Sequence, residues 1–204
     1  PDDAFAHADG GWHLMGCMLS AASCNKWWQD EIIGTTDYKG EEAKITPEML
    51  GKNHVFFLPY LMGERSPIND TNARATFIGM TMDTTRADMT QAMLEGVAFA
   101  IRDSFEVARS IGVEIPRSFI CGGGSRSALW RRIMANVLGI PLDIPATEQG
   151  PGYGAAMLAM VACGEFASVK EAAAALVRVT DTVEPERELA ERYDERYSRF
   201  SKIY

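Results

Sequence analysis

Three consecutive glycines, Gly122, Gly123 and Gly124, are the residues of this sequence whose type and spacing most clearly suggest chemistry. They lie between an apolar segment, 118–121, and a segment with helical spacing, 126–138. At a strand-to-helix turn, bare backbone lets a ligand approach closely, and the N–H groups of the first helical turn point towards that ligand. A tight turn that only needs a positive φ angle would use glycine as well. The spacing leaves both interpretations open.

Two common phosphate-binding patterns are absent around these glycines. The third glycine of GxGxxG is missing from its required position, and no acidic partner for a ribose follows at the usual distance. No Gly-Lys-Ser/Thr sequence follows, which excludes a P-loop. The histidines are far apart and the cysteines form no CxxC pair, so we expect no metal site and buried, reduced thiols.

The composition is that of a globular domain. The 204 residues are 47% hydrophobic and 24% charged, with a formal net charge of −8. An acidic chain argues against a nucleic-acid partner, which would require a basic surface. No apolar stretch has the length of a membrane-spanning helix and no signal peptide is visible, so we expect no membrane partner and a cytoplasmic location. The chain starts at Pro1 without a methionine, and we therefore expect it to be part of a longer protein.

The order of the predicted elements is that of an α/β domain with helices packed on a sheet. The strongest prediction is a helix over 85–111, with a capping-box pair, Thr85 and Asp88, at its start and Gly112 after its end. A buried strand is predicted over 10–19. The other predicted elements are helix 21–33, a short helix within 35–53, strands near 54–58 and 75–81, strand 118–121, helix 126–138, strand 141–145, a small-residue helix 152–163 and a helical tail from about 168 to 204. An apolar stripe on this tail is expected to pack in the core: Leu189, Tyr193, Tyr197, Phe200 and Tyr204.

Segment 75–95 resembles, position by position, the second signature of the FGGY carbohydrate kinases. The match comprises a small residue, an aliphatic or aromatic residue two positions on, Gly79 and Met80, seven further residues, and then Asp88 and a run that ends at Glu95. Three more segments are similar to the xylulokinases of this family: 12–28, 56–67 and 150–159. The resemblance extends over nearly the whole chain.

The resemblance implies an α/β fold of the actin-like, ribonuclease-H-like ATPases. Residues 1–204 would form the C-terminal domain of a two-domain sugar kinase, incomplete at its N-terminus, with the helical tail included. The glycine turn would receive the adenosine of ATP or ADP, used together with Mg²⁺. Glycines at 150, 152 and 154 would let the following helix pack closely beneath the site.

The resemblance also assigns individual residues to the nucleotide site. Gly122, Gly123 and Gly124 would lie against the nucleotide, and Ser127 would occupy the place of a polar adenosine contact. Asp83 and Ala87 fall where related kinases line the other side of the adenine. Alanine can offer only its backbone and its methyl group to that contact.

Several parts of a complete kinase are absent from this sequence. FGGY kinases supply a DxGT loop, a catalytic aspartate and a glycine–threonine loop, and none is present here. No catalytic residue and no metal ligand is therefore assigned, and we expect the isolated chain to be inactive. Without its partner domain, the chain should expose apolar surface and an open sheet edge beside 10–19, which favours self-association. The intact enzyme is expected to be a homodimer.

Four functions remain open at this point. The first is phosphorylation of D-xylulose to D-xylulose 5-phosphate by the complete protein. The second is phosphorylation of gluconate, ribulose, glycerol or a related polyol by the same chemistry. The third is a non-catalytic nucleotide-binding module, and the fourth is an α/β domain whose glycine turn is only structural.

Overall fold

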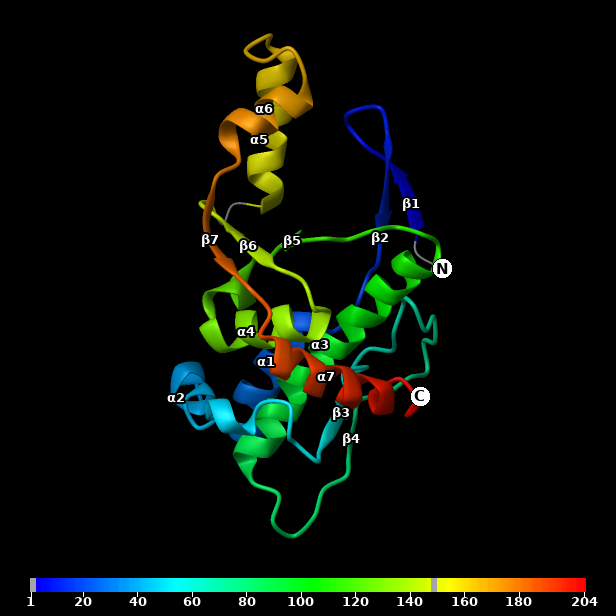
Figure 1. Ribbon diagram of the computed structural model, residues 1–204, viewed down its shortest axis with the longest axis vertical. Helices are drawn as coiled ribbons and strands as arrows, with labels where there is room; N and C mark the ends of the chain where they lie inside the picture. Colours follow the sequence, from blue (N-terminus) through cyan, green and yellow to red (C-terminus); the bar gives the residue numbers. More distant parts are fainter. Residues whose placement is uncertain (1–2, 148–149) are drawn as a thin grey trace.

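Helix α3 (Arg86–Ser110) runs through the centre of the molecule (Figure 1). The predicted capping box starts it: Thr85 Oγ1 accepts from the backbone N–H of Asp88 at 3.2 Å, and Asp88 Oδ2 accepts from that of Thr85 at 2.8 Å. Gly112, with φ +87°, follows its end. All residues from 90 to 100 are buried, so the first half of α3 forms the centre of the core.

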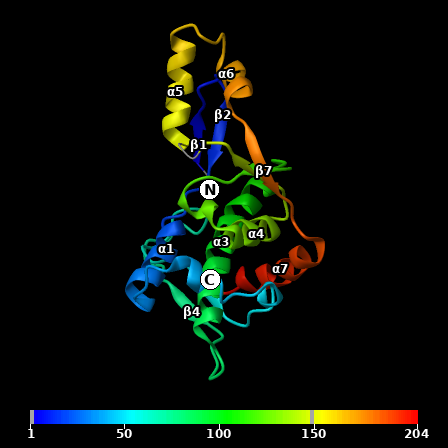
Figure 2. The same cartoon turned by 90° about the vertical axis from the view of Figure 1, so that its left-hand side faces the viewer.

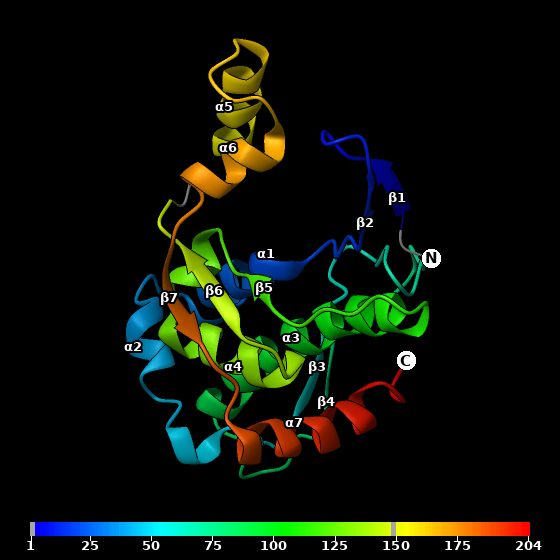
Figure 3. The same cartoon turned by 45° about the horizontal axis from the view of Figure 1, so that its top comes forward.

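The computed structural model describes residues 3–147 and 150–204. Short helices and strands surround α3 (Figures 1 and 3). In chain order, the described elements besides α3 are β1 (Asp3–Ala6), β2 (Trp12–Met15), α1 (Ala21–Trp27), the π-helix Trp28–Ile33, α2 (Tyr38–Glu42), the 3₁₀ helix Pro47–Met49, β3 (Phe56–Leu58), β4 (Thr76–Ile78), β5 (Ser118–Phe119), the 3₁₀ helix Gly123–Arg126, α4 (Ala128–Leu138), β6 (Leu142–Pro145), α5 (Gly150–Ala162), α6 (Val169–Leu176), β7 (Val179–Val183) and α7 (Arg187–Phe200).

The described strands form three small sheets. β1 pairs antiparallel with β2, and β3 pairs antiparallel with β4. In the third sheet β6 is central: it runs parallel to β5 and antiparallel to β7. The β5–α4–β6 unit confirms the predicted strand–helix–strand order around the glycine turn. Strand β7 lies in the tail that the sequence predicted to be helical, because its pairing with β6 is a long-range contact.

The strand predicted over 10–19 forms at Trp12–Met15, but the prediction that it is buried is wrong. All four of its residues are exposed, and Trp12 is 76% exposed. β1 and β2 form a hairpin that stands away from the body of the molecule (Figures 1 and 2). An apolar strand is normally covered by another element of the fold. No described segment of this chain covers the hairpin in this way.

The cysteines also differ from the expectation. Cys24 is buried, but Cys121 and Cys163 are exposed and Cys17 is only partly covered. Cys121 lies two residues after the end of β5 and directly before the glycine segment. Its exposure therefore comes with the exposure of that turn.

Helices α5 and α6 form a projecting pair at the top of the molecule in Figures 1 and 2. The two helices contact each other, and Tyr153 Oη donates to the carbonyl of Leu176 at 3.0 Å. No residue of α5 is buried, although the helix is strongly apolar. A Cβ on Gly152 or Gly154 would meet nothing within 4 Å. The prediction that these glycines allow close helix packing is therefore wrong for the described chain.

Helix α7 returns to the body of the molecule and packs on α4 and α3. Leu189, Tyr193 and Phe200 are buried, as the apolar stripe predicted, whereas Tyr204 is 56% exposed. The tail is thus joined to the core through α7, while α6 projects away from it.

Candidate functional site

The glycine turn leaves bare backbone facing open space. Gly122 has φ +84°, a conformation that L-residues rarely adopt, and a Cβ on Gly122 or Gly123 would meet nothing within 4 Å. A Cβ on Gly124 would contact the indole of Trp130, with Nε1 at 3.3 Å. Ser125 closes the turn, because its N–H and its hydroxyl both donate to the Gly122 carbonyl, at 3.1 and 2.7 Å. No described side chain of this chain fills the space at Gly122 and Gly123.

Ser127 begins helix α4 and also reaches a distant segment. Its Oγ accepts from the backbone N–H of Trp130 at 3.0 Å, which caps the helix. The same hydroxyl donates to Glu42 Oε2 at 2.6 Å. The turn is therefore anchored to α2, 85 positions earlier in the chain.

The predicted nucleotide site has two walls, the glycine turn with Ser127 on one side and the start of α3 on the other. Helix α2 contacts both of them. Glu42 holds Ser127 at the glycine turn, while Glu41 Oε1 lies 2.8 Å from Nη2 of Arg86, the first residue of α3. Lys44 Nζ forms a second ion pair with Glu41 Oε1, at 2.6 Å. Figure 3 shows α2 beside the start of α4. Sequence reasoning missed this contribution. The two glutamates lie in a polar segment, and nothing in its sequence pattern indicates a contact with Ser127.

Asp83 and Ala87 lie at the start of α3, as the sequence placed them. Asp83 is exposed in the loop before the helix, and Ala87 is half-buried in its first turn. In the described part of the chain, no hydrogen bond or ion pair connects either residue to the glycine turn. The two walls are connected instead through α2.

A pocket of about 240 Å³ opens beside the glycine turn, at the ends of β5 and β6. It is lined on the turn side by Cys121 and Ser125, by the guanidinium-bearing residues Arg126 and Arg131, and by Thr147 beyond β6.

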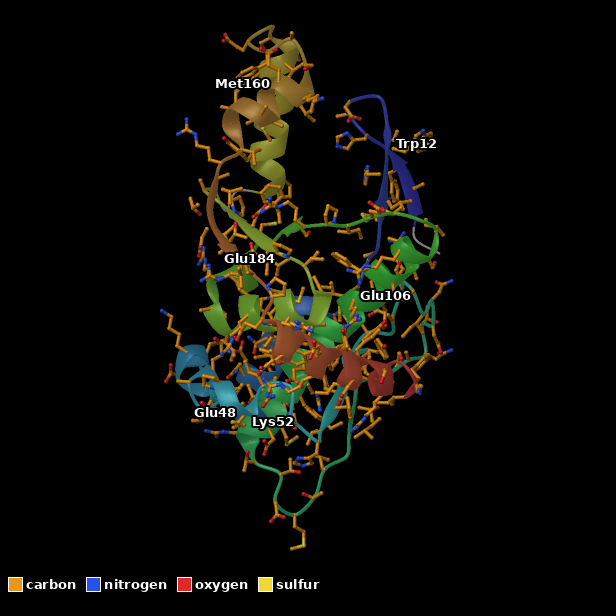
Figure 4. The ribbon with its side chains drawn as sticks, viewed as in Figure 1. Trp12, Glu48, Lys52, Glu106, Met160 and Glu184 are labelled. Carbon is orange, nitrogen blue, oxygen red and sulfur yellow. The ribbon has the colours of Figure 1, made fainter. Side chains whose placement is uncertain are left out.

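A larger apolar groove, of about 510 Å³, separates the β1–β2 hairpin from the second half of α3. Its walls include Trp12 and Leu14 from the hairpin and Ile101 and Phe105 from the helix. Trp12 is labelled on the hairpin in Figure 4. Extensive exposed apolar surface of this kind marks a site of association.

The described residues contain no group of three or more histidine, cysteine or acidic side chains that could hold a metal ion.

Burial raises the pKa of Asp103 to about 6, but its carboxylate is engaged in the core, where Tyr197 Oη donates to Oδ1 at 2.7 Å. It is therefore not placed to act as a base. In the described ranges, none of the helices has both the length and the apolarity needed to cross a membrane.

The strand, the bare glycine turn and the capped helix belong to a mixed α/β domain that superposes on sugar kinases of the actin-like ATPase fold. Residues 3–163 match the model of the C-terminal domain of the FGGY family of carbohydrate kinases, and the chain belongs to this family. The predicted family and fold class are thereby confirmed.

Individual relatives point in the same direction. The chain is 30% identical over 193 residues to a xylulose kinase of Staphylococcus epidermidis, covering 95% of this chain and 39% of that protein. The crystal structure of a xyloylose kinase from Brucella ovis superposes with a TM-score of 0.85 at 38% identity, covering 95% of this chain and 39% of that one. A gluconate kinase from Lactobacillus acidophilus has the same TM-score at 24% identity, with 97% and 40% covered, and shows the shared fold. This chain spans about two fifths of the length of these relatives.

Proposed function

We propose that this chain forms the nucleoside-binding side of a xylulose kinase, which transfers the γ-phosphoryl group of ATP to the 5-hydroxyl of D-xylulose. The observation that carries the proposal is the open backbone at Gly122 and Gly123, located at a strand-to-helix turn in a member of a carbohydrate kinase family. The similarity to xylulose kinases in both sequence and structure supports the choice of sugar.

In this proposal each predicted site residue keeps its role. The adenosine lies on Gly122, Gly123 and Gly124, Ser127 contacts the base, and Asp83 and Ala87 border the opposite side. Phosphoryl transfer depends on positioning and on charge stabilisation, and this chain contributes the positioning of the nucleoside.

The described residues contain no group of three or more histidine, cysteine or acidic side chains that could hold the Mg²⁺ of ATP by themselves. We therefore derive no step through the metal from this chain. The groups that bind the γ-phosphate, the metal and the sugar are proposed to belong to the remaining length that the relatives possess. The apolar groove between the β1–β2 hairpin and α3 is proposed as the surface that this remaining part covers.

Calorimetric titration of the chain with ADP tests the nucleotide site. Gly123→Val should abolish binding without unfolding the protein, because its side chain would enter open space where the ligand is proposed to lie. Gly154→Val is the matched control, since that glycine also faces open space but lies in the projecting α5. Unchanged ADP affinity in Gly123→Val, or no ADP binding by the unmodified chain, would refute the proposed site.

The sugar is tested on the intact enzyme with a panel of D-xylulose, D-ribulose, gluconate and glycerol. We expect the highest kcat/KM for D-xylulose. A preference for gluconate or glycerol would leave the kinase assignment in place and refute the sugar.

A further inference from the structure

We propose that Glu42, together with Ser127, recognises the base of the nucleotide by accepting a hydrogen bond from the 6-amino group of adenine. This inference rests on the proposed nucleotide site and adds to it a residue that lies outside the glycine turn and outside α3. Its starting point is the 2.6 Å hydrogen bond from Ser127 Oγ to Glu42 Oε2.

The hydrogen-bonding capacity of this pair determines what it can bind. A serine hydroxyl has one proton and can accept two hydrogen bonds. The proton of Ser127 is donated to Glu42, and one acceptor position is used by the N–H of Trp130. An ionised carboxylate only accepts. The pair therefore presents acceptors alone, and a group that joins it has to be a donor.

The pair is proposed to meet the base and not the phosphates. In the proposed site Ser127 contacts the base, and its hydroxyl donates to Glu42 Oε2 at 2.6 Å. A phosphate group would be repelled by the Glu42 carboxylate. The donor that joins the pair is therefore expected to come from the uncharged base.

Among purines, adenine presents the matching group at this position. Its 6-amino group donates, whereas the 6-oxo group of hypoxanthine only accepts and would face acceptors. A purine without a 6-substituent keeps the same ring and forms neither contact. A hydrogen bond to a charged acceptor contributes enough to change affinity by roughly tenfold.

A cycle of ligand and protein changes tests the proposal. Titrations compare ADP with purine riboside 5′-diphosphate, which lacks only the 6-amino group, on the unmodified chain and on Glu42→Ala. We expect the unmodified chain to prefer ADP by roughly tenfold, and Glu42→Ala to reduce this preference to within about twofold. Glu48→Ala is the control, because Glu48 is an exposed glutamate of the neighbouring 3₁₀ helix and should keep the full preference (labelled in Figure 4).

The outcomes separate this inference from the function on which it rests. Equal preference for ADP in the unmodified chain and in Glu42→Ala would overturn the role of Glu42, as would the absence of any preference in the unmodified chain. In both cases the proposed nucleotide site would still be supported if the unmodified chain binds ADP and Gly123→Val does not. Failure of both nucleotides to bind the unmodified chain would overturn the site itself and the inference with it. A thermal melt verifies that Glu42→Ala is folded.

Discussion

Replacing Arg196 with methionine would leave a buried carboxylate without its counter-charge. Arg196 Nη2 of α7 lies 2.8 Å from Glu95 Oε2 of α3, and the two side chains are only 7% and 1% exposed. Glu95 Oε1 also accepts from Tyr193 Oη at 3.0 Å and from Gln91 Nε2 at 2.7 Å. The Arg196 guanidinium further donates to the Val55 carbonyl at 3.1 Å.

The magnitude follows from the burial of both partners. Removing one member of a buried ion pair costs about 3–5 kcal/mol, because the other charge stays in a medium of low dielectric. A domain of this size has a total stability of about 5–15 kcal/mol. Since about 1 kcal/mol shifts the Tm of such a domain by about 2–4 °C, Arg196→Met should lower Tm by roughly 10 °C.

The assay is urea unfolding followed by circular dichroism for the two single variants and the double variant. Glu95→Gln removes the charge and keeps the shape, so we expect Arg196→Met/Glu95→Gln to be more stable than the sum of the single losses predicts. A loss below about 1 kcal/mol in Arg196→Met, or strict additivity, would refute the reasoning. The result matters for the site because α7, which lies beyond the matched family residues 3–163, would then stabilise the helix that begins at one wall of the site.

Three further predictions concern other parts of the chain. Burial raises the pKa of Asp103 to about 6, above its unfolded value, so the stability that the protonated form provides is complete near pH 4 and is lost as the pH rises through 6. Asp103→Asn should therefore raise the free energy of unfolding at pH 8 by about 2–3 kcal/mol and flatten its pH dependence, as urea titrations at pH 5 and 8 would show. Ser127→Ala removes the cap of α4 and should cost about 1 kcal/mol in the same assay; an unchanged midpoint would contradict the capping role. Trp12→Ser removes a 76% exposed side chain from the apolar groove, so it should reduce self-association in size-exclusion chromatography without lowering Tm; unchanged association would exclude this face.

Much of the fold was predictable because it depends on neighbouring residues. The capping box of Thr85 and Asp88 starts α3, and glycines in the left-handed region follow the π-helix at Gly34 and α4 at Gly139. These signals act within a few positions of the chain. Strand β7 was missed for the opposite reason, since its place at the edge of β6 depends on a partner almost forty positions away.

The candidate site was predictable only in part. The triple glycine and Ser127 were found from local pattern and resemblance, and the structure adds that the backbone at Gly122 and Gly123 is open. Glu42 could not be found in this way, because a glutamate in a polar segment is usually exposed to solvent. Its relevance comes entirely from the contact with Ser127.

By itself, the sequence determined the membership of the FGGY family, the helices with clear ends and the bare turn that a nucleoside could approach. The tertiary structure alone decided that α2 connects the two walls of the site, that Arg196 neutralises Glu95, and that the hairpin containing Trp12 is exposed. The physical reason is the distance along the sequence over which each interaction acts. Capping and turn conformation arise from adjacent residues, whereas burial and charge pairing depend on which distant segments the completed fold brings into contact.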